Sequence, residues 1–254
     1  MLMGKRAFIT GGNRGIGYAI AQAFIRNGAE VVISGRDREA LEAACSQLGS
    51  SAHPIVWDVR QADIAHDIIA QAAGILGGLD ILVNNAGVNK GMTGQSTSLF
   101  QASVKDWDYV METNLRSVFF ACQAAATYMV EHQIRGHILN IASEMGFSPA
   151  NNAYCISKWG VRGMTEGLGL LLAPMGITVN GIAPGPTATR MMQWCEGDPI
   201  VRQTSPNGRF GLPEEIADMA IFLTCGKGDN IVGQCVLMDG GHVLTRYKEN
   251  RQFI

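Results

Sequence analysis

Short apolar runs alternate along the chain with longer segments in which apolar residues recur every three or four positions. The runs are rich in Ile, Val and Leu and predict buried strands at 6–10, 30–34, 53–57, 80–83, 136–142, 177–182 and 234–238. The segments between them have the helical period. They predict a first helix from about residue 16 and further helices at 37–48, 62–76, 107–132, 152–172 and 213–224.

Strands that alternate with helices, and that are apolar on both faces, indicate a parallel sheet covered on both sides. We therefore expect the α/β class, as a single doubly wound, Rossmann-type domain over 1–254 with a seven-stranded parallel sheet. Two polar stretches, 88–104 and 184–212, follow strands and so should lie where open α/β sheets bind ligands. We interpret them as substrate-side loops, and 242–254 as a C-terminal tail.

The composition narrows the range of partners. The net charge is −2, which offers no basic patch for nucleic acid or an anionic membrane, and no apolar run approaches the roughly 20 residues of a membrane span. A strand pattern starts almost at once, so we expect no signal peptide. The six cysteines are scattered, without a CxxC pair or a nearby His cluster, which predicts no metal site and a reducing, cytoplasmic location.

The turn after the first predicted strand has the composition of a phosphate-binding turn. Its sequence from Thr10 to Gly17 places Gly11, Gly15 and Gly17 between strand and helix, in the spacing G-x-x-x-G-x-G. Such glycines permit a tight turn and a close approach of backbone N–H groups to a pyrophosphate. We interpret the turn as part of a dinucleotide site; the alternative is a glycine-rich turn without a ligand.

The end of the second predicted strand bears on which dinucleotide is bound. NAD sites usually have an acidic side chain here for the ribose 2′-hydroxyl, whereas this chain has Gly35 followed by Arg36. A guanidinium can hold a 2′-phosphate through paired hydrogen bonds, and Arg14 is a second cation on the same side. The pattern favours NADP(H) over NAD(H). In the alternative, Asp37 takes the acidic role, although it also suits the N-cap of the next helix.

Tyr154 and Lys158 are four residues apart at the start of a predicted helix and so share one face. A tyrosine with an ordinary pKa of about 10 exchanges protons poorly at neutral pH, and a neighbouring lysine cation should lower that pKa. The pair therefore fits a general acid/base. The motif alone would also fit an ordinary Tyr–Lys pair on a helix surface.

These elements occur in order with others along the chain: the turn 10–17, Asn-Asn-Ala-Gly at 84–87, Asn114, Ser143, Tyr154, Lys158 and Pro184-Gly185. From residue 5 to residue 241 the chain resembles the short-chain dehydrogenase/reductase family in its single-domain form. The resemblance implies that Ser143 holds the substrate carbonyl oxygen and that Tyr154 gives or takes the proton. It also implies that Lys158 binds the nicotinamide ribose and lowers the Tyr154 pKa, and that Asn114 supports a water chain.

The same resemblance implies a set of cofactor-binding residues. Asp58 would meet the adenine amino group with Val59 against the ring, Thr189 would contact the carboxamide, and Asn84 to Gly87 would support the sheet beside the adenosine ribose. The expected set is Gly11, Asn13, Arg14, Gly15, Ile16, Gly17, Arg36, Asp58, Val59, Asn85, Ala86, Gly87, Tyr154, Lys158, Pro184, Gly185, Thr187 and Thr189.

The substrate side departs from the family pattern. Ser143 and Tyr154 are only eleven residues apart, closer than the family usually has them, so the loop between them is shortened. Ser143 directly follows a predicted strand and is a better candidate than Ser148. Apolar residues in two loops would form a pocket for a ketone or secondary alcohol with a hydrophobic body, namely Met145, Phe147, Met191, Met192 and Trp194.

We expect an enzyme that acts on a small carbonyl or CH–OH substrate. The alternatives are a 3-oxoacyl-thioester reductase and a non-catalytic dinucleotide-binding protein. Gly160, Gly163 and Gly167 lie along one stripe of the predicted helix 152–172, where each costs about 1 kcal/mol relative to alanine. A close approach by a neighbouring strand or by a second subunit would compensate, and the resemblance favours the subunit, in a homotetramer or a homodimer.

Overall fold

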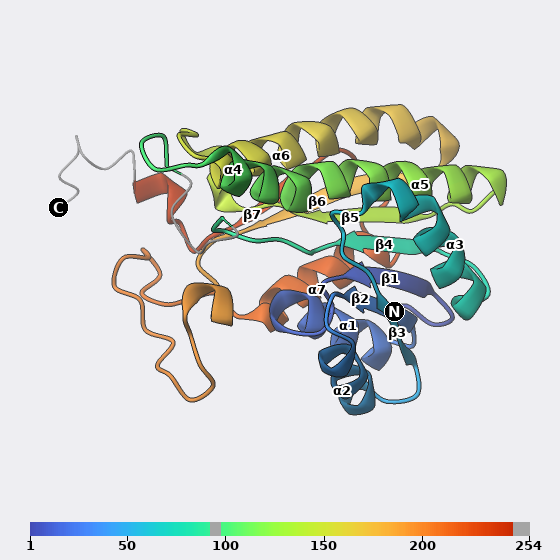
Figure 1. Ribbon diagram of the computed structural model, residues 1–254. Coiled ribbons are helices and arrows are strands. Elements are labelled where there is room, and N and C mark those ends of the chain that lie inside the picture. Colours follow the sequence, from blue (N-terminus) through green and yellow to red (C-terminus); the bar gives the residue numbers. More distant parts are fainter. Residues whose placement is uncertain (92–97, 246–254) are drawn as a thin grey trace.

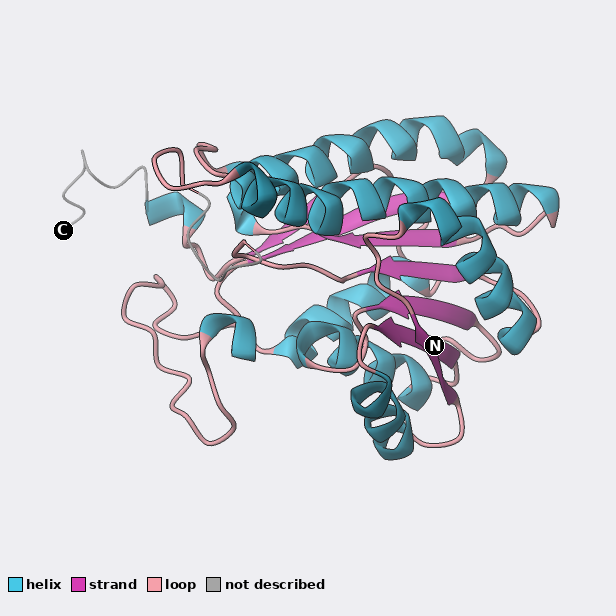
Figure 2. Ribbon diagram, viewed as in Figure 1, coloured by secondary structure: helices cyan, strands magenta, loops and turns pink. Residues whose placement is uncertain are grey.

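The computed structural model describes residues 1–91 and 98–245, and its centre is a seven-stranded parallel sheet (Figures 1 and 2). The strand order is β3-β2-β1-β4-β5-β6-β7, and every neighbouring pair is parallel. The predicted class and strand number are therefore confirmed. The strands are β1 (Arg6–Thr10), β2 (Glu30–Gly35), β3 (Ala52–Val56), β4 (Ile81–Asn84), β5 (His137–Ile141), β6 (Thr178–Pro184) and β7 (Cys235–Met238).

Helices cover both faces of this sheet. One buried cluster joins α1 (Gly15–Arg26), α2 (Arg38–Leu48) and α7 (Pro213–Thr224) to one face. A second cluster joins α3 (Ala65–Leu76), α5 (Ser117–Glu131) and α6 (Ala153–Leu172) to the other face (Figure 1). Successive residues of a strand point to opposite faces, so the strands must be apolar throughout, as the sequence pattern indicated. Within the described residues, no helix is long and apolar enough to cross a membrane.

The predicted helix 107–132 differs from the structure in two ways. It begins earlier, as α4 (Val104–Met111), because the Ser103 side chain caps it by accepting a hydrogen bond from the Asp106 N–H at 3.1 Å. It also contains a π-helical turn, Glu112–Arg116, between α4 and α5. A periodicity argument assumes one regular helix, so it could not reveal the wider turn.

Both predicted loops leave the carboxyl end of the sheet. The first includes 92–97, outside the described residues, and much of the predicted tail lies outside them too, at 246–254. The second loop contains a 3₁₀ turn, Arg190–Met192. The Asn89 side-chain amide donates to the Met191 carbonyl at 3.5 Å, so the two loops meet.

Two helical glycines should respond oppositely to alanine. A Cβ at Gly169 in α6 would lie 2.6 Å from the Gly233 Cα, whereas a Cβ at Gly74 in α3 would meet nothing within 4 Å. Gly169→Ala should therefore lower the free energy of unfolding by about 1–3 kcal/mol. Gly74→Ala should raise it by up to ~1 kcal/mol through helix propensity alone. Urea unfolding of both variants at one protein concentration tests this, and equal shifts would contradict the close packing of α6 on the 233 turn.

Candidate active site

The carboxyl ends of β1 and β4 meet where the strand order reverses, and hydrogen bonds hold them together. The Asn85 side-chain amide donates to the Thr10 carbonyl at 3.0 Å and to the Gly11 carbonyl at 2.9 Å. The Asn85 and Ala86 N–H groups donate to the Thr10 hydroxyl at 3.0 and 3.1 Å. Deeper in the sheet, the Asn84 amide donates to the Asn140 side chain at 2.9 Å. The predicted motif 84–87 thus supports the sheet at its switch point, where such folds bind ligands.

The glycine-rich turn lies directly on this junction. Gly11 and Gly15 have φ values of +65° and +57°, which side chains with a Cβ adopt poorly. A Cβ at Gly17 would lie 2.4 Å from both the Asn85 amide nitrogen and the Gly11 carbonyl oxygen. The Arg14 side chain does not cap α1, so the helix presents its first N–H groups at the turn. The backbone here fits a pyrophosphate group.

The remaining residues predicted around this turn take several positions. The Asn13 side-chain oxygen would be 3.4 Å from a Cβ at Gly35, so Asn13 lies over the end of β2. Ile16 and Val59 instead pack against the two buried cores. A Cβ at Gly15 would lie 3.5 Å from the Thr189 methyl, which brings the loop after β6 to the phosphate turn.

The backbone after β6 runs from Pro184, at the end of that strand, towards Thr189. Gly185 leaves no space for a side chain, because an added Cβ would lie 2.6 Å from the Asp239 Cα. Thr187 is buried and its hydroxyl donates to the Gly185 carbonyl at 3.0 Å, while the Thr189 hydroxyl donates to the Thr187 carbonyl at 3.3 Å. These bonds fix the path of the loop on which Thr189 is carried.

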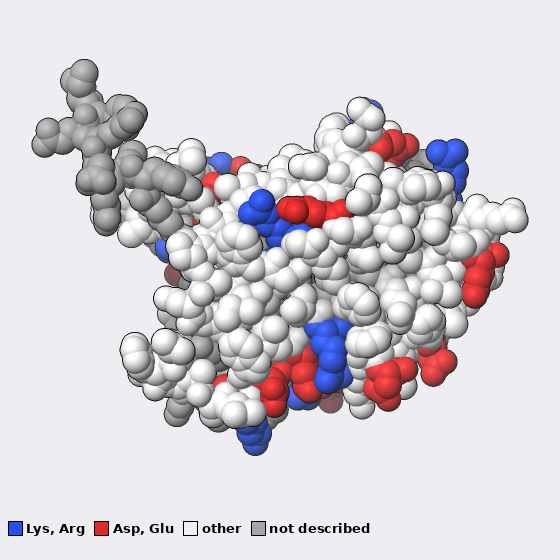
Figure 3. Space-filling view, turned by 90° about the horizontal axis from the view of Figure 1, so that it is seen from above, with Lys and Arg blue, Asp and Glu red and all other residues white. Residues whose placement is uncertain are grey.

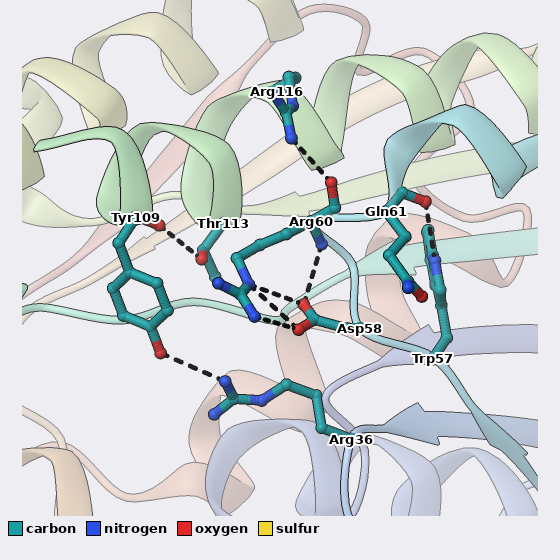
Figure 4. Close-up of polar contacts among 8 residues, drawn as sticks. All are labelled: Arg36, Trp57, Asp58, Arg60, Gln61, Tyr109, Thr113 and Arg116. Carbon is teal, nitrogen blue, oxygen red and sulfur yellow. Dashed lines mark hydrogen bonds and ion pairs between the residues drawn. The ribbon is translucent and has the colours of Figure 1, made fainter. Parts of the chain in front are cut away.

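A carboxylate, two arginines and a tyrosine lie together near the ends of β2 and β3 (Figure 4). Arg60 donates hydrogen bonds to the Asp58 carboxylate from its Nη2 at 2.5 Å and from its Nε at 3.1 Å. This pairing holds the pKa of Asp58 below its ordinary value. The Arg60 guanidinium lies 5.2 Å from the Tyr109 ring centroid. Arg36, which is exposed, donates to the Tyr109 hydroxyl at 3.3 Å. Tyr109 thus connects α4 to the end of β2.

Asp37 lies next to Arg36 but serves the helix. Its carboxylate accepts a hydrogen bond from the Ala40 N–H at 3.1 Å, as the N-cap of α2. The capping role considered from the sequence is therefore confirmed. Arg60 and Tyr109 are functional candidates that the sequence reading missed. The spacing of Arg60 from Asp58 could have suggested the first, but no pattern in the sequence indicates Tyr109.

Asn114 lies within the π-helical turn and is fully buried. Its amide donates to the Val88 carbonyl at 2.8 Å and its oxygen accepts from the Val88 N–H at 2.8 Å. The amide also approaches the Ser157 hydroxyl at 3.2 Å. A Cβ at Gly87 would lie 3.4 Å from the Asn114 side-chain oxygen and 3.8 Å from the Lys158 Nζ, so both groups border the same glycine.

Ser143, Tyr154 and Lys158 come together where β5 ends and α6 begins. The Asn152 side chain caps α6 by accepting from the Cys155 N–H at 2.9 Å, which places Tyr154 in the first turn. The Ser143 and Tyr154 hydroxyls are hydrogen-bonded. One turn later, the Lys158 Nζ lies 5.9 Å from the Tyr154 ring centroid and donates to the Ile141 carbonyl at 2.9 Å.

The protonation of this group differs from the sequence expectation. Burial raises the pKa of Tyr154, and the hydrogen bond with Ser143 lowers it only in part. Burial also lowers the pKa of Lys158 to about 8. The expected lowering of the Tyr154 pKa by Lys158 is thus not found in this chain, because burial disfavours the charged form of both groups.

The predicted apolar pocket is only partly assembled. Met191 and Met192 are exposed neighbours in one 3₁₀ turn, with Trp194 two residues further on. Met145 is in the short turn after Ser143. Phe147 instead packs against the buried core, with the Arg162 guanidinium 4.1 Å from its ring centroid. A periodicity argument could not separate Phe147 from the loop residues, because its role depends on the path of the shortened loop.

No group of three or more His, Cys, Asp or Glu side chains in the described part of the chain could hold a metal ion. The polar groups at the site are instead those of the glycine turn, the Asp58 cluster and the Ser143, Tyr154 and Lys158 group.

Comparison with known proteins agrees with this arrangement. A family model described as short chain dehydrogenase matches residues 5–198. The chain is 37% identical to gluconate 5-dehydrogenase of Gluconobacter oxydans, over 96% of each chain. It is 34% identical to the 3-oxoacyl-acyl-carrier-protein reductase FabG of Chlamydia muridarum, over 95% of this chain and 98% of the other.

Among solved structures, a short chain dehydrogenase from Burkholderia cenocepacia in complex with NADP superposes with a TM-score of 0.83 at 32% identity. The match covers 95% of this chain and 98% of the other. Because the family model covers most of the chain and the relatives span nearly all of it, this protein belongs to the short-chain dehydrogenase family.

Proposed function

We propose that this oxidoreductase uses NADP(H) to interconvert a ketone or aldehyde and an alcohol, with Tyr154 as the general acid/base. The observation that carries the proposal is the joining of Ser143, Tyr154 and Lys158 at one strand end, beside a turn that fits a pyrophosphate. A bound nicotinamide supplies or accepts the hydride, and the side chains supply orientation and the proton.

In reduction, the Ser143 hydroxyl donates a hydrogen bond to the carbonyl oxygen as negative charge develops there. Tyr154 donates its proton to that oxygen, and in oxidation it removes the proton from the alcohol. Burial keeps Tyr154 protonated at neutral pH, which suits the donor role. Lys158 would bind the nicotinamide ribose, and Asn114, held by Val88 beside Gly87, would anchor the water that returns the proton.

Tyr154→Phe should lower turnover by at least about 100-fold, because it removes the transferable proton and little else. NADPH binding, followed by fluorescence, should remain nearly unchanged. Tyr128→Phe is the matched control. Tyr128 lies in α5 and stacks on His132, so its substitution should leave turnover unchanged. Retained activity in Tyr154→Phe would refute the assigned acid/base, and wild-type protein inactive on every substrate would favour a dinucleotide-binding protein without catalysis.

The preference for NADP(H) rests on charge at the β2 end. Arg36 is exposed and bonded to Tyr109, and among the described residues it makes no ion pair, although its charge contributes to the lowered pKa of Asp58. Asp37, the alternative ligand for a ribose hydroxyl, is engaged as a helix cap. The Burkholderia structure, described as a complex with NADP, adds support from a relative.

Arg36→Asp should lower the ratio of kcat/KM for NADPH to kcat/KM for NADH by about tenfold or more. The substitution removes a hydrogen-bond donor to the 2′-phosphate and puts a repelling negative charge in its place. Arg38→Asp makes the same charge change two residues away, where the side chain faces Glu42 at 3.7 Å, and should move the ratio much less. Equal effects would show that the phosphate contact lies elsewhere.

The substrate is a small molecule with a carbonyl or CH–OH group, and two classes remain. The exposed methionines of the loop after β6 support a ketone or secondary alcohol with an apolar body. A 3-oxoacyl thioester is the second candidate, because relatives at 34% identity are reductases of such substrates. A panel of apolar ketones, apolar secondary alcohols and acyl thioesters, each with both cofactors, separates them. We further propose that the enzyme acts in the cytoplasm.

We also propose that the protein assembles as a homodimer or homotetramer through α5 and α6. An apolar groove of about 610 Å³ lies between these helices, lined by Leu115, Phe119, Phe120, Met164, Leu168 and Leu171 among others. Added Cβ atoms at Gly163 and Gly167 would meet nothing within 4 Å, so no neighbour in the described chain accounts for these glycines. Seen from above, this side shows wide areas without charged groups (Figure 3).

Replacing Phe119 and Leu171 together by Asp should shift the protein to monomers, because charged groups at an apolar contact are costly to bury. Phe119 is 45% and Leu171 60% exposed in the single chain. Ile75→Asp, on α3 and 42% exposed, is the matched control and should leave the assembly intact. Sedimentation velocity at micromolar concentration measures both; monomeric wild-type protein would overturn the proposal.

A further inference from the structure

A buried carboxylate lies next to the catalytic serine, and the mechanism above does not use it. Glu144 follows Ser143 directly and is only 6% exposed. Its two oxygens are 2.8 and 3.0 Å from the Nδ1 of His242. Carboxylates are seldom buried to this extent without a defined partner or role.

His242 belongs to a tightly bonded turn that follows β7. The Asp239 carboxylate accepts from the Gly241 N–H at 2.9 Å and from the Val243 N–H at 2.6 Å. The Gly240 carbonyl accepts from the Asn207 N–H at 3.3 Å, which ties this turn to the loop after β6. These bonds fix the backbone of the turn that carries His242. In Figure 1 this red segment lies at the same end of the sheet as the start of α6.

The turn that Glu144 opens, Glu144–Phe147, packs on α6 beside the tyrosine, because a Cβ at Gly146 would lie only 2.8 Å from the Lys158 carbonyl oxygen. Besides burial, the negative charge of Glu144 contributes to the raised pKa of Tyr154, together with Cys155, while Ser143 opposes them. From α6, Lys158 lies beside the tyrosine ring, and Cys235 of β7 lies beyond Lys158. Among these groups Glu144 is the carboxylate, and it comes from the turn after β5 rather than from α6.

We propose that Glu144 is a positioning residue that sets the pH range in which Tyr154 exchanges its proton, and that His242 holds the Glu144 carboxylate in place. This proposal rests on the proposed role of Tyr154 and goes beyond it. A negative charge near a phenol favours the protonated form, so Glu144 raises the pH at which Tyr154 can take the proton from the alcohol in oxidation. The turn after β7 then influences Tyr154 through the hydrogen bond between His242 and Glu144.

Two readouts test the proposal. The first is the ultraviolet titration of tyrosinate with NADP⁺ bound, taken as a difference from Tyr154→Phe, so that it reports Tyr154 alone. The second is the pH profile of kcat/KM for alcohol oxidation. Glu144→Gln should move both midpoints to lower pH by about one unit, since it removes one nearby negative charge.

Glu166→Gln is the matched control, because it removes the same charge from an exposed site on α6, where Glu166 pairs with Arg162 at 3.2 Å. It should leave both midpoints unchanged. At position 242, His242→Asn keeps a nitrogen donor near the Nδ1 position and should retain the wild-type profile. His242→Leu removes the donor and should move the midpoints or lower kcat several-fold, and Glu144→Gln in addition should cause little further change.

The outcomes are distinct. Midpoints within 0.2 unit of wild type in Glu144→Gln, against the shift of about one unit, would overturn this inference whatever the activity. If Glu144→Gln loses activity while the tyrosinate midpoint stays unchanged, Glu144 only stabilises the local structure. This result would also overturn the inference. If the tyrosinate midpoint moves while the activity profile does not, Glu144 acts on Tyr154 as inferred, and the acid/base role assigned to Tyr154 fails instead.

Discussion

The hydrogen bonds between the ends of β1 and β4 constrain everything at the site. The single Asn85 amide satisfies two carbonyls of the phosphate turn, and the Thr10 hydroxyl accepts two N–H groups from the chain that leaves β4. The turn can fit there only without a side chain at Gly17. Because this junction fixes both the glycine-rich turn and the start of the path towards Asn114, a change in either strand end would displace both halves of the candidate site.

Much of this could be predicted from the sequence, since it depends on local chemistry. Strands with two buried faces have a continuous apolar pattern, so the parallel sheet could be predicted before its order was known. Tyr154 and Lys158 share a helix face for reasons of spacing alone, and Asp37 caps α2 as its residue type suggests. Glycines that need positive φ could likewise be recognised in the turn.

What could not be predicted depends on contacts between distant segments. His242 meets Glu144 across 98 positions and Tyr109 meets Arg36 across 73, and no periodicity connects them. The predicted lowering of the Tyr154 pKa was wrong for a related reason. Proximity to a lysine follows from spacing, whereas the depth of burial, which is the largest cause of the raised pKa, follows from the whole fold. Phe147 was misplaced because the shortened loop turns it towards the core.

The π-helical turn at Glu112–Arg116 has a consequence for how this protein can vary. A π turn accommodates one more residue than a regular helical turn, and each residue of a helix rotates the next by about 100°. Removing a single residue there would give a smoother α4–α5 helix, yet it would turn Asn114 away from Val88 or shift α4 against the Arg36 side of the crevice. The irregularity therefore sets the rotation of Asn114 relative to Tyr109, and we expect substitutions here to be tolerated far better than changes in length.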